Sequence, residues 1–297
     1  LLRLLQESLE QAGEDPRVLY VSLQYTVLGG IEDLECKSNA KSLAGMRTLL
    51  VADASELLGS NKDWSNWDET YNYAVGRDPA YLDNNLMQTT FDNLGVDVFI
   101  ILDGDGRLIL SKGSEAFPQS DANAITELVV SSGCFTAQGD AWEASGYLDQ
   151  HGVLLEVAAS AILTSDGAGP SAGTLVFAHF LNDEDIAVYA MSGEGTYRYV
   201  PTSVLTDGTP YAENVWLEPA TTNTFLGVIE IPLINDSGNG YIEATLPRPI
   251  YHEGLRLNTI LLSTLVFVFL ALTGISLYMT DRTLLSKIDE IGANLVS

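Results

Sequence analysis

The segment DWSNWDETY, residues 63–71, is the starting point for the fold because it sets two tryptophans and a tyrosine beside three acids. On an α-helix, Trp64, Trp67 and Tyr71 would stand at positions i, i+3 and i+7 and line one face, with Asp63 and Asp68 flanking that stripe. The pattern predicts the end of an amphipathic helix whose rings pack on a core while its acids face water.

The residues around this segment predict further helices. Apolar side chains recur near helical spacing from 31 to 59, which indicates a long helix that segment 63–71 continues or caps and that GRDPAY (76–81) ends. A short helix is predicted at 84–94, stopped by Gly95. Another is predicted at 121–131, with Asp121 as its N-cap.

Strands follow with a period of two. VDVFIIL (96–102) and RLIL (107–110) flank the turn DGDG and predict a β-hairpin. Further strands are predicted on both sides of a turn at 150–152, at 173–181, and on both sides of DSGNG (236–240). A short helix capped by Asn182 or Asp183 is predicted to run through Met191. Helix first, then an antiparallel sheet with an inserted helix, is an α+β fold.

The composition limits the classes of partner. The chain of 297 residues has 40 acidic residues against 14 Lys and Arg, a formal net charge of -26. This excess repels nucleic acids and anionic lipid surfaces, so we expect no nucleic-acid partner. A hydrophobic content of 46% is enough for one large domain or two smaller domains.

Little in the sequence indicates catalysis. The three histidines are far apart, and Cys36 and Cys134 lack metal-ligand spacing, although they could form a single disulfide. Asp103 and Asp105 in DGDG suggest a calcium loop, but the residue at the twelfth position is Ser114. Asp63 with Asp68, or Asp103 with Asp105, are acid pairs that could serve acid–base chemistry. We expect no cofactor, no metal and no catalytic site, so enzyme activity would have to come from a module outside these residues.

One segment predicts a membrane location. Residues 257–280, LNTILLSTLVFVFLALTGISLYMT, carry no charge and are long enough to cross a bilayer as a helix. Arg282 and Lys287 favour a cytoplasmic tail at 281–297, which would place everything before Arg256 outside. The triplet Asn235-Asp236-Ser237 is an N-glycosylation acceptor and agrees with an external face.

The two ends of the chain are less clear. Residues 1–30 contain only about 13 mostly apolar residues, so a first membrane helix is absent or degenerate there, or lies upstream. Beyond the span, coiled-coil-like spacing predicts the start of a signalling helix whose seam would pair in a homodimer. The seam residues are Leu284, Leu285, Ile288, Ile291 and Leu295.

DWSNWDETY, followed by NNLMQTT and the hairpin VDVFIILDGDGRLILS, resembles the CHASE4 family of extracellular sensory domains. The strands LLEVAASAIL and GPSAGTLVFAHFLND extend the resemblance, and Ala161 replaces the usual proline. The family implies a PAS-like or Cache-like sheet after the long helix. It also implies a place between two membrane helices in a receptor with a histidine kinase, cyclase or chemotaxis module.

On this basis we expect an extracytoplasmic sensory domain at 31–255 that detects a small-molecule ligand and signals through the membrane helix. Asp63, Trp64, Trp67, Asp68 and Tyr71 are the candidate ligand-binding or signal-coupling residues. The alternative is a single-pass acidic surface protein that serves as a structural or adaptor subunit. A sensor should have a ligand pocket, whereas a scaffold should have a filled core and a large apolar patch.

Overall fold

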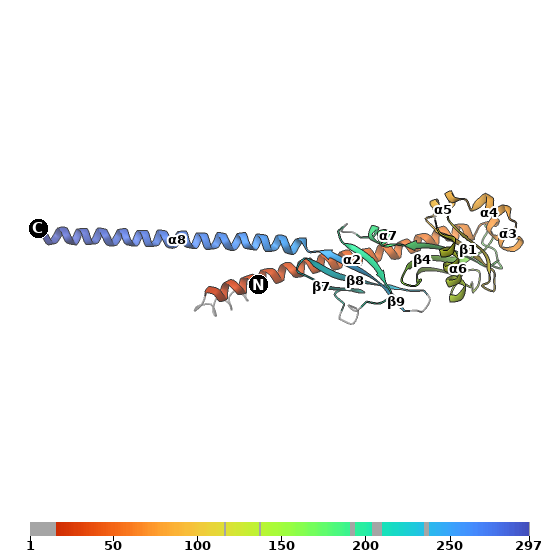
Figure 1. The fold of residues 1–297 in the computed structure, drawn as a ribbon, viewed down its shortest axis with the longest axis horizontal. Coiled ribbons are helices and arrows are strands. Elements are labelled where there is room, and N and C mark those ends of the chain that lie inside the picture. Colours follow the sequence, from red (N-terminus) through yellow and green to blue (C-terminus); the bar gives the residue numbers. More distant parts are fainter. Residues whose placement is uncertain are drawn as a thin grey trace. The chain divides into compact units, whose positions relative to one another are not determined.

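The computed structural model describes residues 16–115, 117–136, 138–190, 194–203, 210–234 and 238–296, without the side chains of 16–24, 269 and 284–296. The chain divides into two units. One unit contains residues 1–36 and 248–297, and the other contains residues 37–247. Figure 1 shows the helices and strands of both units, with labels on many of them. The acceptor triplet 235–237 lies outside the described residues.

Helix α2 spans Pro16–Ser65, so it extends beyond the predicted helix of 31–59 at both ends. In the unit 37–247 a set of its buried apolar side chains repeats every three or four residues, which places them on one helix face. These side chains are Leu43, Met46, Leu50, Ala54 and Leu57. This continuous stripe explains why one helix can pack along the sheets of that unit.

The unit 37–247 contains a five-stranded antiparallel sheet, sheet A, in the order β2-β1-β5-β4-β3. The hairpin and the later strands predicted from the alternating pattern are present. Their bounds are β1 (Val98–Leu102), β2 (Leu108–Gly113), β3 (Glu143–Asp149), β4 (Leu154–Ala161) and β5 (Thr174–Leu181). Strands β1 and β4 are buried at every residue because both faces of the sheet are covered.

Sheet A has helices on both faces. Phe99 and Phe177 point to the face where Leu57 of α2 packs. Because successive side chains alternate along a strand, Val98 and Val176 point to the opposite face, where they pack with Ile125 of helix α6. The predicted α+β fold, a long N-terminal helix followed by antiparallel strands, is confirmed.

The turn DGDG closes the β1–β2 hairpin, as predicted. Asp103 Oδ1 accepts hydrogen bonds from the backbone N–H groups of Asp105 (2.9 Å) and Arg107 (2.8 Å). Gly106 has a φ of 77°, and a Cβ there would lie 2.5 Å from Oγ1 of Thr136, so only glycine fits. The Asp103 carboxylate therefore holds the turn together.

Three short helices follow α2 in the sequence, before the first strand of sheet A. They are α3 (Asp68–Gly76), α4 (Ala80–Asn85) and α5 (Gln88–Leu94). The prediction of one helix at 84–94 was wrong, because Met87 is extended and the Thr90 hydroxyl bonds the carbonyl of Asn85. GRDPAY breaks the helical stretch as predicted, because α3 ends at Gly76 and the next helix, α4, begins only at Ala80. Gly95 ends α5 in the left-handed conformation, as predicted.

Two further helices occur between strands in the sequence: α6 (Gln119–Ser132) follows β2, and α7 (Asp183–Val188) follows β5. The prediction of Asp121 as the N-cap of α6 was wrong: Pro118 is the cap residue, and its carbonyl accepts from the N–H of Asp121 (2.9 Å). Asn182 caps α7 in a reciprocal capping box, in agreement with one of the two predicted caps. Helix α7 ends at Val188, before the predicted Met191.

A second antiparallel sheet, sheet B, has the order β6-β9-β8-β7 and was not distinguished from sheet A in the sequence. Its strands are β6 (Thr196–Val200), β7 (Val215–Pro219), β8 (Thr224–Pro232) and β9 (Asn239–Pro247). Helix α2 contacts this sheet: a Cβ on Gly227 would lie 2.5 Å from Cδ1 of Leu43, and Arg47 donates to the carbonyl of Glu230 (3.1 Å). Strands β8 and β9 are the two predicted around DSGNG.

In the other unit, helix α8 runs from Pro249 to Val296. It includes the predicted span 257–280 but starts earlier, because proline suits the first turn of a helix, where no N–H donor is needed. Of the described helices, α8 alone is long and apolar enough to cross a membrane, over Pro249–Thr283, and none of its most apolar 18-residue stretch is buried. The side chains of the predicted seam, at 284–295, lie outside the described residues.

Candidate functional site

The segment 63–71 contains a helix break. Helix α2 ends at Ser65, Trp67 is extended (φ −114°, ψ 131°), and α3 begins at Asp68. The carbonyl of Ser65 accepts a hydrogen bond from the N–H of Leu163 (3.0 Å) instead of continuing the helix. The prediction that Trp64, Trp67 and Tyr71 line one continuous helix was therefore wrong.

The two tryptophan rings nonetheless lie together, at the end of α2. Trp64 and Trp67 meet edge to face with ring centroids 5.5 Å apart, and Trp64 meets Phe99 of β1 in the same way at 5.9 Å. Edge-to-face contacts of this kind add to the stabilisation that burial provides. Trp64 therefore joins the helix end to sheet A, and Trp67 packs against Trp64. Both tryptophans are half-buried, so some ring surface remains accessible.

Asp68 and Tyr71 contact the loop between β4 and β5. The N–H of Ser165 donates to Asp68 Oδ1 (2.9 Å), and the N–H of Asp68 donates to the Ser165 hydroxyl (3.1 Å). The Tyr71 hydroxyl lies 3.5 Å from the carbonyl of Pro170. Asp63 is exposed. The structure thus brings four of the five predicted residues to one region, and two of them, Asp68 and Tyr71, hold α3 against this loop.

A buried polar network beside these residues was missed in the sequence. Asn61, with no exposed surface, donates through Nδ2 to the carbonyls of Ala158 and Leu175 (3.2 Å each). The Ser160 hydroxyl lies 2.6 Å from Asn61 Oδ1 and 2.7 Å from the Ser65 hydroxyl. Asn61 follows the stripe of Leu50, Ala54 and Leu57 at helical spacing, and an amide at an apolar position is the signal that could have revealed it.

A second polar cluster lies in the unit of residues 1–36 and 248–297. The Arg248 side chain is 5% exposed and donates through Nε to Oε2 of Glu35 (3.1 Å), which is 1% exposed. Its Nη2 reaches Glu32 (3.2 Å), and its guanidinium lies 4.1 Å from the ring centroid of Tyr251. The N–H of Tyr251 donates to the other Glu35 oxygen (3.0 Å). Arg248 thus ties the start of α8 to α2 immediately before the apolar helix.

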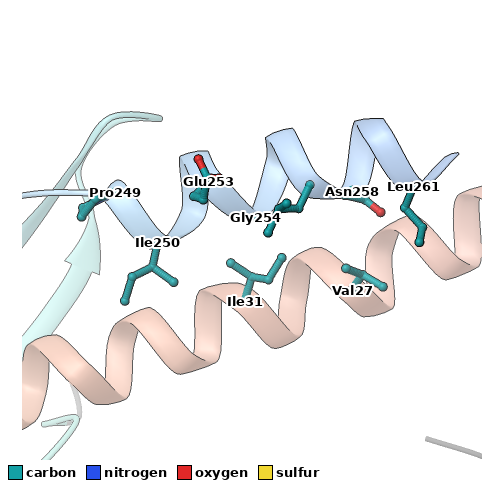
Figure 2. Close-up of a pocket in the computed structure, with 9 residues that line it drawn as sticks. Val27, Ile31, Pro249, Ile250, Glu253, Gly254, Asn258 and Leu261 are labelled. Carbon is teal, nitrogen blue, oxygen red and sulfur yellow. The ribbon is translucent and has the colours of Figure 1, made fainter. Parts of the chain in front are cut away.

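The same two helices pack closely beyond this ion pair. A Cβ on Gly254 would lie 2.5 Å from Cδ1 of Ile31, so only glycine permits the contact. Figure 2 shows Ile250 and Leu261 pointing from α8 toward α2, while Ile31 and Val27 point back. They line an apolar groove of about 650 Å³ that also includes Asn258. Asn258 is buried, and its Oδ1 has no hydrogen-bond partner in the described part of the chain.

The remaining candidates occupy structural positions. His179 Nδ1 lies 2.9 Å from Asp97 Oδ2, which also accepts from the N–H of Phe180 (2.8 Å). Burial lowers the pKa of His179, but the carboxylates of Asp97, Glu156 and Asp185 outweigh this and raise it. Both cysteines are free thiols.

In the described residues, a long helix packs on antiparallel sheets, and the last strand is followed in the sequence by a helix long and apolar enough to cross a membrane. Residues 49–193 match the model of the CHASE4 domain, the family that this part of the sequence resembles.

One known protein similar to this chain is a histidine kinase. The methanogenesis regulatory histidine kinase FilI of Methanothrix harundinacea is 23% identical over 282 residues, which cover 90% of this chain and 32% of that kinase. The chain therefore spans about a third of its relative's length.

Two solved structures are among those that the comparison aligned with this chain. The periplasmic domain of LuxQ from Vibrio cholerae is 12% identical, with a TM-score of 0.43 over 70% of this chain and 98% of that one. The ligand-binding domain of the Campylobacter jejuni chemoreceptor Tlp3, solved with L-valine, is 11% identical, with a TM-score of 0.43 over 81% and 100%.

Proposed function

We propose that this chain is the extracytoplasmic sensory part of a membrane-bound signal-transduction receptor of the histidine kinase, cyclase or chemoreceptor type. Residues 31–255 would detect a small-molecule ligand, the span 257–280 would cross the membrane, and 281–297 would begin a cytoplasmic signalling helix that pairs in a homodimer. The CHASE4 match and the kinase relative support this proposal. Arg282 and Lys287 support a cytoplasmic tail.

The observation that carries the proposal is the position of Arg248. Strand β9 ends at Pro247 and α8 begins at Pro249, so Arg248 alone connects the last strand to the apolar helix. Its buried pairing with Glu35 fixes this connection to α2. We therefore expect a movement of α2 at Glu35 to reach the first turn of α8 through this ion pair.

The residues of segment 63–71 have a coupling role in this proposal. Trp64 attaches the end of α2 to sheet A, with Trp67 packed against it. Asp68 and Tyr71 attach α3 to the β4–β5 loop. A change in the sheet would reach α2 through these contacts. Of the five candidate residues, Asp63 is exposed, so a ligand could contact its side chain without moving the helix.

Two measurements on the whole chain in lipid nanodiscs test the proposal. The first is thermal unfolding against a panel of amino acids and small carboxylic acids, in which a ligand at 100 times its Kd should add about 2.7 kcal/mol of stability. The second fuses a histidine kinase module after Ser297 and measures autophosphorylation. Arg248→Gln should keep the thermal shift and lose the response to the ligand.

The scaffold alternative predicts different results in both measurements. If no compound in the panel raises the melting temperature, ligand detection has no support and the adaptor reading gains. If Arg248→Gln signals normally while ligand binding is intact, the connection at Arg248 does not carry the signal, and the proposed route through α8 is refuted.

A further inference from the structure

A buried carboxyl group lies between helix α2 and sheet A. Glu156 is 2% exposed, and its Oε1 has no hydrogen-bond partner in the described part of the chain. Ser160, four residues further along β4, hydrogen bonds to Asn61 of α2. Since side chains alternate along a strand, Glu156 points to this same face, beneath the helix.

The groups around Glu156 come from every element packed against it. Tyr147 of β3 and His179 of β5 are its cross-strand partners in register. Above them, the Tyr147 hydroxyl donates to the carbonyl of Leu50 (2.8 Å), and the Tyr189 hydroxyl donates to Asp53 Oδ2, so both tyrosines hold α2. The titratable and charged groups facing this site are Asp53, Tyr147, His179, Tyr189 and, through His179, Asp97 and Asp185.

This environment disfavours the charged form of Glu156. Burial removes the carboxylate from water, and the negative charge of Asp53 opposes a second one; His179 acts in the other direction. Together they raise the pKa of Glu156 to about 7. A neutral carboxyl is tolerated in such a place, whereas an ionised one without a hydrogen-bond partner is costly.

We propose that Glu156 is a proton-binding site of this domain, and that release of its proton weakens the packing of α2 against sheet A between Leu50 and Asp53. Protonated Glu156 lies as a neutral side chain under the helix. Ionised Glu156 is repelled by the negative charge of Asp53. This repulsion is weakened when this part of the helix separates from the sheet and admits water. The packing of helix α2 on sheet A would thus respond to the pH of its surroundings.

The inference does not depend on the receptor function, because its effect is confined to the packing of one helix on one sheet. A domain with no ligand would show it equally. Conversely, a receptor could bind its ligand and signal while Glu156 titrates at an ordinary pH, so the two proposals fail separately.

Infrared spectroscopy of the whole chain in nanodiscs tests the first step. The difference between wild type and Glu156→Gln isolates the carbonyl band of one protonated carboxyl group, and its midpoint should lie near pH 7. Asp53→Asn keeps an acceptor for Tyr189 and removes the opposing charge, so it should lower that midpoint. A midpoint below pH 5 in the wild type, or one that Asp53→Asn leaves unchanged, would overturn the assignment.

Hydrogen–deuterium exchange tests the second step. After correction for the intrinsic effect of pH, opening of residues 50–57 should increase roughly 25-fold between pH 5.5 and pH 8, from the ratio of proton binding in the closed and open forms. Glu156→Gln mimics the protonated form, so it should fold and should lose most of this increase. Glu127→Gln, at an exposed position of α6, should keep it. Equal exchange at both pH values in the wild type would refute the coupling.

Discussion

The Asn61 network offers a quantitative test of how α2 is attached to sheet A. Asn61→Leu keeps the side-chain volume close to that of asparagine but removes the bonds to Ala158, Leu175 and Ser160. A buried hydrogen bond contributes about 1 kcal/mol net, so the loss of three should lower the free energy of unfolding by roughly 3 kcal/mol. For a domain of about 200 residues this corresponds to a melting temperature lower by roughly 6–12 °C.

The assay is thermal unfolding followed by circular dichroism, with the whole chain in nanodiscs. Asn72→Leu, on the exposed side of α3, is the matched control and should change stability by less than about 0.5 kcal/mol. Ser160→Ala combined with Asn61→Leu should lose less than the sum of the two single changes, because the two residues share a bond. If Asn61→Leu melts within 2 °C of the wild type, roughly the uncertainty of such comparisons, the network does not secure the helix.

Three further predictions follow from the other clusters. Glu35→Leu should lower the free energy of unfolding by about 3–5 kcal/mol in denaturant, because it leaves buried Arg248 without its main partner. The double variant Glu35→Leu with Arg248→Met should recover most of this loss. Equal losses in the single and the double variant would contradict this explanation. The pKa of Glu156 is about 7 in the folded chain, against 4.5 for an ordinary glutamate. Between these pH values the unfolded chain releases a proton that the folded chain keeps. The free energy of unfolding should therefore fall by roughly 3 kcal/mol as pH rises from 4.5 to 7. That slope should be absent in Glu156→Gln, apart from a loss at higher pH from His179, whose raised pKa acts in the same direction. Asp68→Ala removes the acceptor for the N–H of Ser165, so this amide should lose its protection from hydrogen exchange. The free energy of global unfolding should change by no more than about 1 kcal/mol. Unchanged exchange at the Ser165 amide would show that the contact does not hold the loop.

The parts of the fold that depend on local pattern could be predicted from the sequence. The apolar stripe of α2, the alternation in the strands, the turn DGDG and the stop at Gly95 all depend on residues close together in the chain. The second sheet was less visible because β6 (TYRYV) and β7 (VWLEP) are short and weakly alternating. Their place is set by pairing with β9 and β8.

The parts that escaped prediction depend on contacts between distant residues. The helix break after Ser65 depends on the N–H of Leu163, and the burial of Asn61 depends on carbonyls 97 and 114 residues away. Glu35 and Arg248 are separated by 213 positions and looked like two of many charged residues. The segment 63–71 was recognised as unusual, but its division between two helices could not be deduced from spacing alone.

The single-residue connection between β9 and α8 has a consequence for anyone who joins this chain to another protein. Each residue added to an α-helix turns everything beyond it by about 100°. An insertion or deletion next to Arg248 would therefore change which side of α8 faces its neighbours along its entire length, although no apolar residue had been altered. A fusion keeps the natural rotation of the joined protein about the helix axis only if the number of residues from Arg248 to the junction is preserved. In a series of fusions that each add one residue to α8, activity should therefore rise and fall with a period near 3.6 residues.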